Sequence, residues 1–463
     1  MTMTKFEQTT IDKITSLYDK LQEVECKERE VPEETAEGRS EYARDYARIL
    51  YSSSFRRLQG KMQILGIETT AFYRNRLTHS LEVSQIARSL AKILAFKCGK
   101  EMYCDEELYL LDAAALAHDI GHPAFGHKGE RVLDEIAKLY GLRFEGNAQN
   151  FRVLRKLDRH GSSPKGLNLT YRTLLAINKY IESEKTKTAN GDDPKKFMYQ
   201  EDYVFLDEFR QKNEIKKRTI DVQIIEIADD IAYAVHDLED GLAQGLFTID
   251  EIIHEIKTFN DEKGRIQKND IENATKEFEK IVNQIKEKLD KEKNITTIQE
   301  YSHLFRKQLT SKLTDDFVRS IVFEKNEKVN EDELRMDSTH RVLCSILSKN
   351  IFKGATRNSS IALYELKGEI IIKSLFNLYV DKEINKDYLL LPPDYRPKET
   401  DTTEQKVRCV MDYIAGMMDT YAISEFERLT GISYDSMDVT KIPNVLKTYD
   451  RRNVISRAPI ELK

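Results

Sequence analysis

The sequence predicts a mainly α-helical protein, and three observations support this fold class. Apolar residues recur at helical spacing along most of the 463 residues, whereas the alternation typical of half-buried strands is rare. Only 9 prolines and 19 glycines are present, so few residues would interrupt long helices. The length allows one large core or about two to three ordinary domains.

The composition is that of a folded protein without a dominant charge. Charged residues make up 33% of the chain, but the net charge is only -6. No overall basic field therefore favours nucleic-acid binding, although a local basic groove stays possible. The five cysteines show no paired spacing, which indicates reduced thiols and a cytoplasmic protein. The polar N-terminus and the lack of a long apolar run predict neither a signal peptide nor a membrane span.

The first half of the chain contains clear helical patterns. We expect an N-terminal helical segment over residues 1–50, with a helix from near Tyr42, and a core domain over residues 51–250. In this core a helix is predicted from Thr78, which would cap its N-terminus. The apolar stripe of that helix comprises Leu81, Ile86, Leu90 and Leu94. The next helix, "DEELYLLDAAALAHD", is apolar on most sides and is expected to be buried.

Composition changes along the second half indicate how it is organised. Turn-forming residues near 183–200 predict a surface insertion, and residues 221–242 form an amphipathic helical pattern. Residues 251–340 are rich in Lys and Glu and predict a charged helical lobe. Residues 341–463 predict a C-terminal helical region that packs on the core. Its last long helix is expected over residues 407–429.

The stretch "LAHDIGHPAFGH" ends a predicted helix with three histidines and an aspartate. His118 and Asp119 are adjacent, about 100° apart on a helix, so both can face a cation only near the helix end. Their mixed nitrogen and oxygen donors suit Mn, Fe, Co, Ni or Mg better than a structural zinc. A lone histidine here would more simply be a hydrogen-bonded helix-end residue. His79, His122 and His127 nearby weaken that simpler interpretation.

The helix around Asp229 carries an unusual excess of acidic residues. Asp229, Tyr233 and Asp237 form one ridge at spacings of four residues, flanked by Glu226, His236 and Asp240. Residues 219–256 contain ten acidic residues and no Lys or Arg. Like charges at this spacing cost roughly 0.2–0.5 kcal/mol per pair. The face is therefore either solvated, compensated by Lys or Arg from elsewhere in the fold, or built to hold a cation.

A third segment, "FYRNRLTHSLE", has the residues of an anion site. Arg76 and His79 lie near a predicted helix start, where backbone N–H groups also point outward. Arginine, histidine and a helix N-terminus together suit a phosphate. Ordinary basic surface residues are the simpler alternative for any one of them.

The order of His79, the His118–Asp119 pair and the distant Asp229 resembles the HD-domain metal-dependent phosphohydrolases. The resemblance extends to the deoxynucleoside triphosphate (dNTP) triphosphohydrolases, the bacterial dGTPase family, and spans about residues 52–421. It is carried by "SSFRRLQGKMQ", "YRNRLTHSLEVSQIARSLA", "LAHDIGHPAFGHKGE", "IEIADDIAYAVHDLEDGL" and "DYIAGMMDTYA".

The resemblance implies an all-α HD-domain fold and one divalent metal, Mn²⁺, Mg²⁺ or a similar ion, held by His79, His118, Asp119 and Asp229. Asp229 is preferred to Asp230 because the family pattern Asp-x3-Tyr-x3-Asp fits it. The implied reaction cleaves a dNTP, dGTP among them, between the 5′ oxygen and the α-phosphorus. It releases the deoxynucleoside and inorganic triphosphate.

The resemblance also implies roles for individual side chains. His127 would transfer a proton at the attacking water or the leaving oxygen, with Glu130, one helical turn later, orienting it. Arg76 and His122 match positions that contact the phosphates.

Further positions match groups around the sugar. Tyr233 would lie beside the sugar or the phosphates, and Gln63 and Asp237 match groups near the sugar 3′ hydroxyl. Tyr364 is a candidate for closing the pocket against a 2′ hydroxyl.

Two other functions stay open from the sequence. One is another HD chemistry, such as hydrolysis of phosphomonoesters or cyclic nucleotides. The other is a nucleotide-sensing or single-stranded-DNA-binding protein with a vestigial HD site. The resemblance further implies a homo-oligomer built from dimers, such as a hexamer, and an effector dNTP or single-stranded DNA as a partner.

Overall fold

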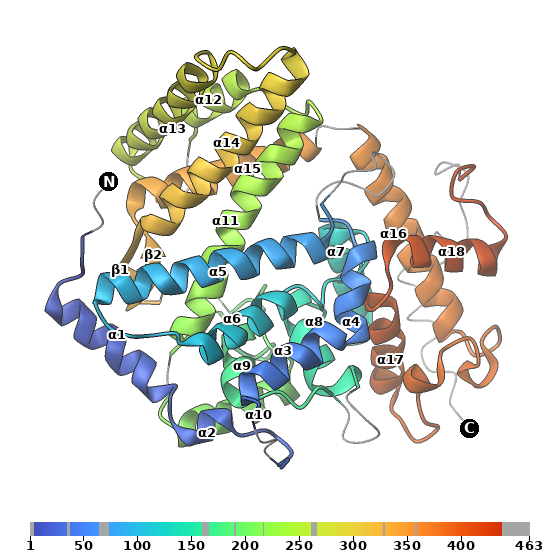
Figure 1. Cartoon of the computed structure of the whole chain (residues 1–463). Coiled ribbons are helices and arrows are strands. Elements are labelled where there is room, and N and C mark those ends of the chain that lie inside the picture. The colour runs from blue at the N-terminus through green and yellow to red at the C-terminus, as the bar shows by residue number, and fades with distance from the viewer. Residues whose placement is uncertain are drawn as a thin grey trace.

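The computed structural model describes residues 4–34, 38–63, 74–159, 166–188, 191–215, 217–260, 266–326, 329–356 and 359–437. Within these residues lie eighteen α-helices, α1–α18, and one antiparallel hairpin of strands β1 (Ile321–Asn326) and β2 (Glu331–Met336) (Figure 1). The predicted all-α fold class is confirmed, and the hairpin is an element that the sequence pattern did not predict. No helix of the described residues is long and apolar enough to cross a membrane.

Three long helices form the centre of the larger apolar core. α5 (Arg76–Cys98) packs against both α6 (Asp105–Ala117) and α11 (Ile220–Ala243), and the short α9 (Tyr171–Ile177) contacts α6 and α11. α3 (Glu41–Tyr51) covers the other side of α6. Burial of their apolar faces fixes the relative positions of helices that are far apart in the sequence. Smaller helices complete this part: α1 (Gln8–Lys20), α2 (Val24–Lys27), α4 (Ser53–Arg57), α8 (Gly146–Arg152) and α10 (Gln200–Lys212).

Helix α5 begins earlier than the sequence pattern predicted. Its N-cap is Asn75, whose side chain accepts a hydrogen bond from the Thr78 backbone N–H at 3.0 Å. The Thr78 hydroxyl accepts from the Asn75 backbone N–H, which completes a capping box. Leu81 is 50% exposed and does not belong to the buried stripe. Five residues separate it from Ile86, a rotation of about 140° around the helix axis.

The region at the top of Figure 1 consists of long helices with charged outer faces. It contains α12 (Ile249–Lys257), α13 (Lys268–Leu289) and α14 (Ile298–Arg319), which pack on one another, on α11 and on α15 (Ser338–Thr356). Their inner faces extend the larger core through side chains such as Phe278. The exact limits of this lobe stay a prediction.

The C-terminal helices enclose a second apolar core. α16 (Ser359–Val380), α17 (Thr403–Ala415) and α18 (Asp419–Thr430) pack together, and α16 also packs against α7 (Gly126–Leu139). The single long helix expected over residues 407–429 is wrong, because the chain leaves helical geometry between α17 and α18. Gly416, a weak helix former, lies at this break.

Candidate active site

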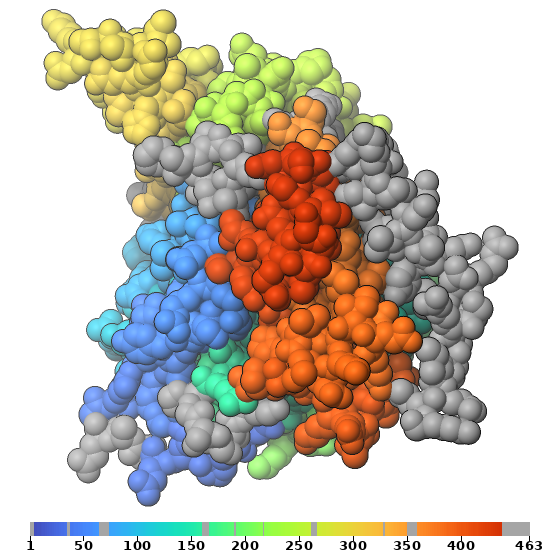
Figure 2. Space-filling model, turned by 90° about the vertical axis from the view of Figure 1, so that its right-hand side faces the viewer, coloured from blue at the N-terminus to red at the C-terminus, as the bar shows by residue number. Residues whose placement is uncertain are grey.

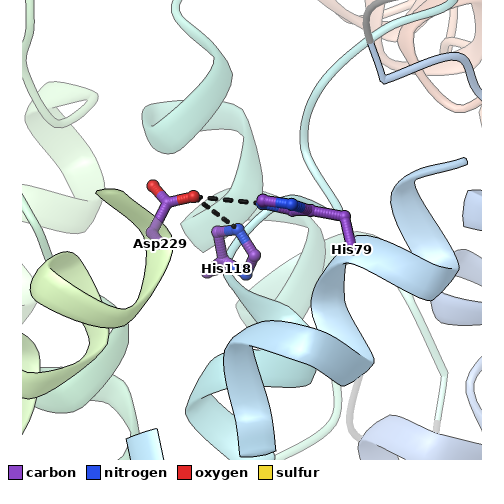
Figure 3. Close-up of side chains that lie close together, drawn as sticks. All are labelled: His79, His118 and Asp229. Carbon is purple, nitrogen blue, oxygen red and sulfur yellow. Dashed lines mark hydrogen bonds and ion pairs between the residues drawn. The ribbon is translucent and has the colours of Figure 1, made fainter. Parts of the chain in front are cut away.

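Three helices bring two imidazoles and a carboxylate together (Figure 3). His79 comes from α5, His118 follows the last residue of α6, and Asp229 comes from α11. The Oδ1 atom of Asp229 lies 3.1 Å from Nε2 of His79 and 3.5 Å from Nε2 of His118. The ligand atoms of all three lie within 4.8 Å of one another. This spacing fits a single cation between them.

The hydrogen bonding of His118 favours a metal ligand. Its Nδ1 lies 2.6 Å from the carbonyl oxygen of Ala115, so Nδ1 carries the proton. Nε2 is buried without a hydrogen-bond partner and points toward the cluster. Burial lowers the pKa of His118, but the charges of Asp119 and Asp229 outweigh it and raise that pKa to about 9. The pocket therefore attracts positive charge, and the backbone contact is the kind that orients metal-binding histidines.

Asp119 lies at the edge of this cluster. Its Oδ2 accepts a hydrogen bond from Arg76, and its Oδ1 lies 3.0 Å from Nδ1 of His122. The same Oδ1 is 3.8 Å from Nε2 of His118. Burial raises the pKa of Asp119, but the charges of Arg76, His122 and His118 outweigh this and hold the pKa well below its usual range. Asp119 is thus an anion next to the three-residue cluster.

The acidic face of α11 is largely compensated by basic residues from other segments. Arg218 donates to Glu226, and Arg74 Nη1 donates to Asp240 at 2.6 Å. The Nζ atom of Lys179 lies 3.6 Å from Oδ2 of Asp229. The sequence left three explanations open for the acidic face: solvation, compensation by Lys or Arg, and binding of a cation. Compensation by basic residues therefore applies to most of the face. The Oδ1 atom of Asp229 faces the two histidines instead.

His127 and Glu130 lie on the first turn of α7. The Nδ1 atom of His127 is 3.4 Å from Oε2 of Glu130, and the other carboxylate oxygen accepts from the Gly146 backbone N–H at 3.0 Å. Burial raises the pKa of Glu130, but its hydrogen bond to His127 and the charges of His122 and Lys196 outweigh it and lower the pKa. The side chain of His127 is 55% exposed and remains accessible. Glu130 is thus an ionised partner that can orient His127.

His122, His127 and Glu130 also have ligand atoms within 4.8 Å of one another. A second cation there would compete with the ammonium of Lys196, which lies 3.3 Å from Oε1 of Glu130. Lys196 therefore already supplies a positive charge next to Glu130, which disfavours a metal ion at this group.

One cavity of about 170 Å³ joins these groups. Sequence-predicted site residues line it: Gln63, Arg76, His118, Asp119, His122, His127, Asp229 and Tyr233. Further lining side chains were not singled out from the sequence as site residues: Asn147, Lys179, Tyr180, Lys196 and Glu226 among them.

The missed residues come mainly from the segment after α9. Lys179 and Tyr180 directly follow the last turn of that helix, and Lys196 ends the turn-rich stretch near 183–200. Burial lowers the pKa of Lys179, but the charges of Asp229 and Glu226 outweigh it and raise the pKa, so its amine stays charged. The only sequence signal was a Lys–Tyr pair after an apolar helix, which does not differ from an ordinary surface loop.

Two predicted sugar-side residues do not line the cavity. Asp237 is buried one turn beyond Tyr233, and burial together with the charge of Asp240 raises its pKa well above the usual value. The Tyr364 hydroxyl donates to Asp419 at 2.9 Å, and its ring packs on Phe125. Tyr364 is therefore engaged in the second core, and the structure gives it no contact with this cavity.

Comparisons with known proteins agree with this architecture. Residues 76–234 match the HD domain, and residues 334–428 match the phosphohydrolase-associated domain. The helical fold, the histidine–aspartate cluster and these matches define an HD-domain phosphohydrolase.

Similar proteins identify the family within that class. A deoxyguanosinetriphosphate triphosphohydrolase-like protein 2 of Vibrio cholerae serotype O1 is 41% identical over 85% of this chain and 89% of that protein. Similar proteins occur in Deinococcus radiodurans, at 34% identity over 87% and 95%, and in Shewanella loihica, at 33% over 83% and 91%. The chain belongs to the family of deoxyguanosinetriphosphate triphosphohydrolase-like proteins.

Proposed function

We propose that this protein is a metal-dependent dNTP triphosphohydrolase that accepts dGTP. It would cleave the bond between the 5′ oxygen and the α-phosphorus and release deoxynucleoside and inorganic triphosphate. One observation carries the proposal: His118 and Asp229 of the three-residue cluster line the same cavity as His127, and several basic side chains line it too.

His79, His118 and Asp229 would hold one divalent cation such as Mn²⁺ or Mg²⁺, with Asp119 as the fourth ligand. The buried, unpartnered Nε2 of His118 and the mixed nitrogen and oxygen donors fit such an ion. A bound cation polarises a phosphoryl oxygen and stabilises the charge that develops on it.

The basic residues of the cavity would bind the triphosphate. Arg76, Lys179 and Lys196 all line it, and His122 lies between the cluster and His127. Lys179 and Lys196 each lie beside a carboxylate, so they would bind the polyanion as charged donors that already belong to ion pairs. These contacts would hold the α-phosphate close to His127.

His127 would then move one proton during the reaction. Its imidazole can take a proton from the attacking water or give one to the leaving 5′ oxygen. Glu130 would keep the ring oriented through its contact with Nδ1, which leaves Nε2 free to meet the reacting atoms.

Gln63 and Tyr233 line the same cavity and would contact the sugar or the adjoining phosphate. Asp237, one turn beyond Tyr233 on the same helix, would act near the sugar 3′ hydroxyl. Assembly into homo-oligomers and binding of an effector dNTP or single-stranded DNA stay predictions from the family resemblance. A cytoplasmic location stays a prediction from the cysteine spacing of the sequence.

The test is to incubate the purified protein with each dNTP and either Mn²⁺ or Mg²⁺ and to separate the products. Deoxynucleoside with intact triphosphate is the expected result. Release of mono- or diphosphate would favour another HD-type hydrolysis. Nucleotide or single-stranded-DNA binding without turnover under any metal would favour the sensing or binding protein with a vestigial site.

A further inference from the structure

The turn between α6 and α7 crosses from one apolar core to the other. Ile120 packs in the larger core, whereas Ala124 and Phe125 belong to the second core, with the C-terminal helices. Phe125 has a φ of 60°, in the left-handed region that is strained for a non-glycine residue. This conformation persists only where surrounding contacts hold it. His122 and His127 lie on either side of this segment.

A buried carboxylate from the C-terminal region supplies such contacts. Asp419 is 0% exposed, and its Oδ1 accepts a hydrogen bond from the Phe125 backbone N–H at 3.1 Å. Its Oδ2 accepts from the Met62 backbone N–H at 3.1 Å and from the Tyr364 hydroxyl at 2.9 Å. Three donors from three segments therefore converge on one anion, and each is charge-assisted.

A buried lysine connects the same parts of the chain. Lys61 donates to the backbone carbonyl of His122 and, at 3.0 Å, to that of Ala415 at the end of α17. Lys61 directly precedes Met62, and both residues bind the C-terminal region. The Lys61 side chain donates to Ala415, and the Met62 backbone donates to Asp419. The Lys61 ammonium thus links the backbone of His122 to the end of α17.

Packing on α16 leaves little space for the turn to move. A Cβ atom at Gly368 would lie 2.4 Å from the Phe125 ring, so only glycine permits this approach. The Tyr364 ring lies beside Phe125, with 5.5 Å between ring centroids. In Figure 2, the orange and red C-terminal region lies directly against the blue part of the chain. Both polar and apolar contacts thus fix the turn to this region.

We propose that Asp419 is a positioning residue, which holds the 120–127 turn so that His122 and His127 face the metal cluster. The phosphohydrolase-associated region, which contains Asp419 and Tyr364, would thereby act on a reaction carried out in the HD domain. This inference rests on the proposed function for the reaction itself. Asp419 does not line the cavity, so it acts through the backbone of Phe125.

Asp419→Asn tests the proposal, because the amide keeps the shape but presents an N–H group to one of the donors. We expect kcat to fall at least about tenfold while KM changes less than about threefold, since small displacements of catalytic groups cost up to about 100-fold. The metal content should stay at the wild-type level.

Glu425→Gln is the matched control on the same helix. Glu425 is also buried, and it accepts hydrogen bonds from Tyr379 at 2.8 Å and from Arg428, away from the turn. It should lower the melting temperature without lowering kcat. Wild-type kcat in Asp419→Asn, or equal losses of kcat in both variants, would overturn the proposal.

Hydrogen exchange resolved to single amides separates this inference from the proposed function. In the wild-type protein the Phe125 amide should exchange slowly, and in Asp419→Asn at least about tenfold faster. This readout needs no turnover, so it decides the role of Asp419 even if no dNTP is hydrolysed. If Asp419→Asn does not fold, fast exchange at Phe125 in the wild type would overturn the proposal, and slow exchange would support it.

Discussion

The Nε2 atom of His79 lies 3.1 Å from the Oδ1 atom of Asp229, although 150 residues separate them in the sequence. The contact exists because α5 and α11 pack along each other in the larger core. Burial alone would raise the pKa of Asp229. The effects of His118, His79 and Lys179 are larger and hold that pKa well below its usual range. An anion is therefore held between two imidazoles, where a metal ion would bind.

Asp229→Ala should remove the bound metal, because it deletes the carboxylate that both histidines face. Substitution of a residue that only hydrogen-bonds to a metal ligand already weakens metal affinity by about tenfold or more. Loss of a ligand itself is therefore expected to weaken the affinity by at least about tenfold. The measurement is metal content by atomic spectroscopy after gel filtration. Asp230→Ala, on the next residue and on the exposed side of α11, is the control and should retain one ion per chain. Loss of metal in the control alone would show that the wrong aspartate was chosen.

His127→Ala should abolish most turnover and keep the metal. General acid–base catalysis contributes roughly 10²–10⁴-fold, so kcat should fall by that amount. Glu130→Gln should lower kcat in the same direction but less, because the amide can still hold the ring. Steady-state kinetics alongside metal analysis would measure both effects. A near-normal rate in His127→Ala would exclude its role in proton transfer.

Lys179→Met should weaken binding of the triphosphate group. A charge-assisted hydrogen bond contributes about 1.5–3 kcal/mol, which corresponds to roughly 10–100-fold in affinity. The readout is the inhibition constant of inorganic triphosphate, which reports on the phosphate subsite without a base or sugar. Lys195→Met, a nearby exposed lysine, should leave this constant unchanged. Equal inhibition of wild type and Lys179→Met would place the phosphates elsewhere in the cavity.

Glu33→Gln should change stability in a pH-dependent way. Burial raises the pKa of Glu33, but hydrogen bonds from Arg48 and Asn168 outweigh it and lower the pKa to about 2, from 4.5. A lowered carboxyl pKa contributes stability that is fully present above pH 4.5 and is lost as pH falls toward about 2. Because the group is partly exposed, we expect a loss of about 1 kcal/mol at pH 7.

Urea unfolding at pH 7, 5 and 4 measures this difference. The gap between wild type and Glu33→Gln should be constant down to about pH 5 and narrow at pH 4. Glu34→Gln is the neighbouring control. A gap that widens toward pH 4 would contradict the assignment.

The fold class was accessible from the sequence because local patterns determine it, whereas the grouping of His79, His118 and Asp229 was expected from the family resemblance. Helical periodicity predicts helices, and the adjacent His118 and Asp119 at a helix end restrict where a cation can bind. The start of α5 was misplaced because Asn75 and Thr78 both have capping side chains, and only the packed helix shows which one caps. The break before Asp419 was missed because apolar spacing continues across it.

Long-range contacts could not be predicted. Lys179 and Lys196 reach the cavity through the path of the chain between α9 and α10, which no periodicity describes. The bonds from Asp419 to Phe125 and Met62 join residues 294 and 357 positions apart. Such contacts form where the larger apolar core packs against the second core. A single sequence contains no local pattern that predicts them.

The most direct test of the central claim is hydrolysis of dGTP in water enriched in oxygen-18, with mass spectrometry of the products. The account predicts attack at the α-phosphorus, so the label should appear in inorganic triphosphate and the deoxynucleoside should contain none. Label in the deoxynucleoside would mean cleavage of the carbon–oxygen bond. Label in free monophosphate or diphosphate would mean attack at another phosphorus, and either result would contradict the proposed reaction.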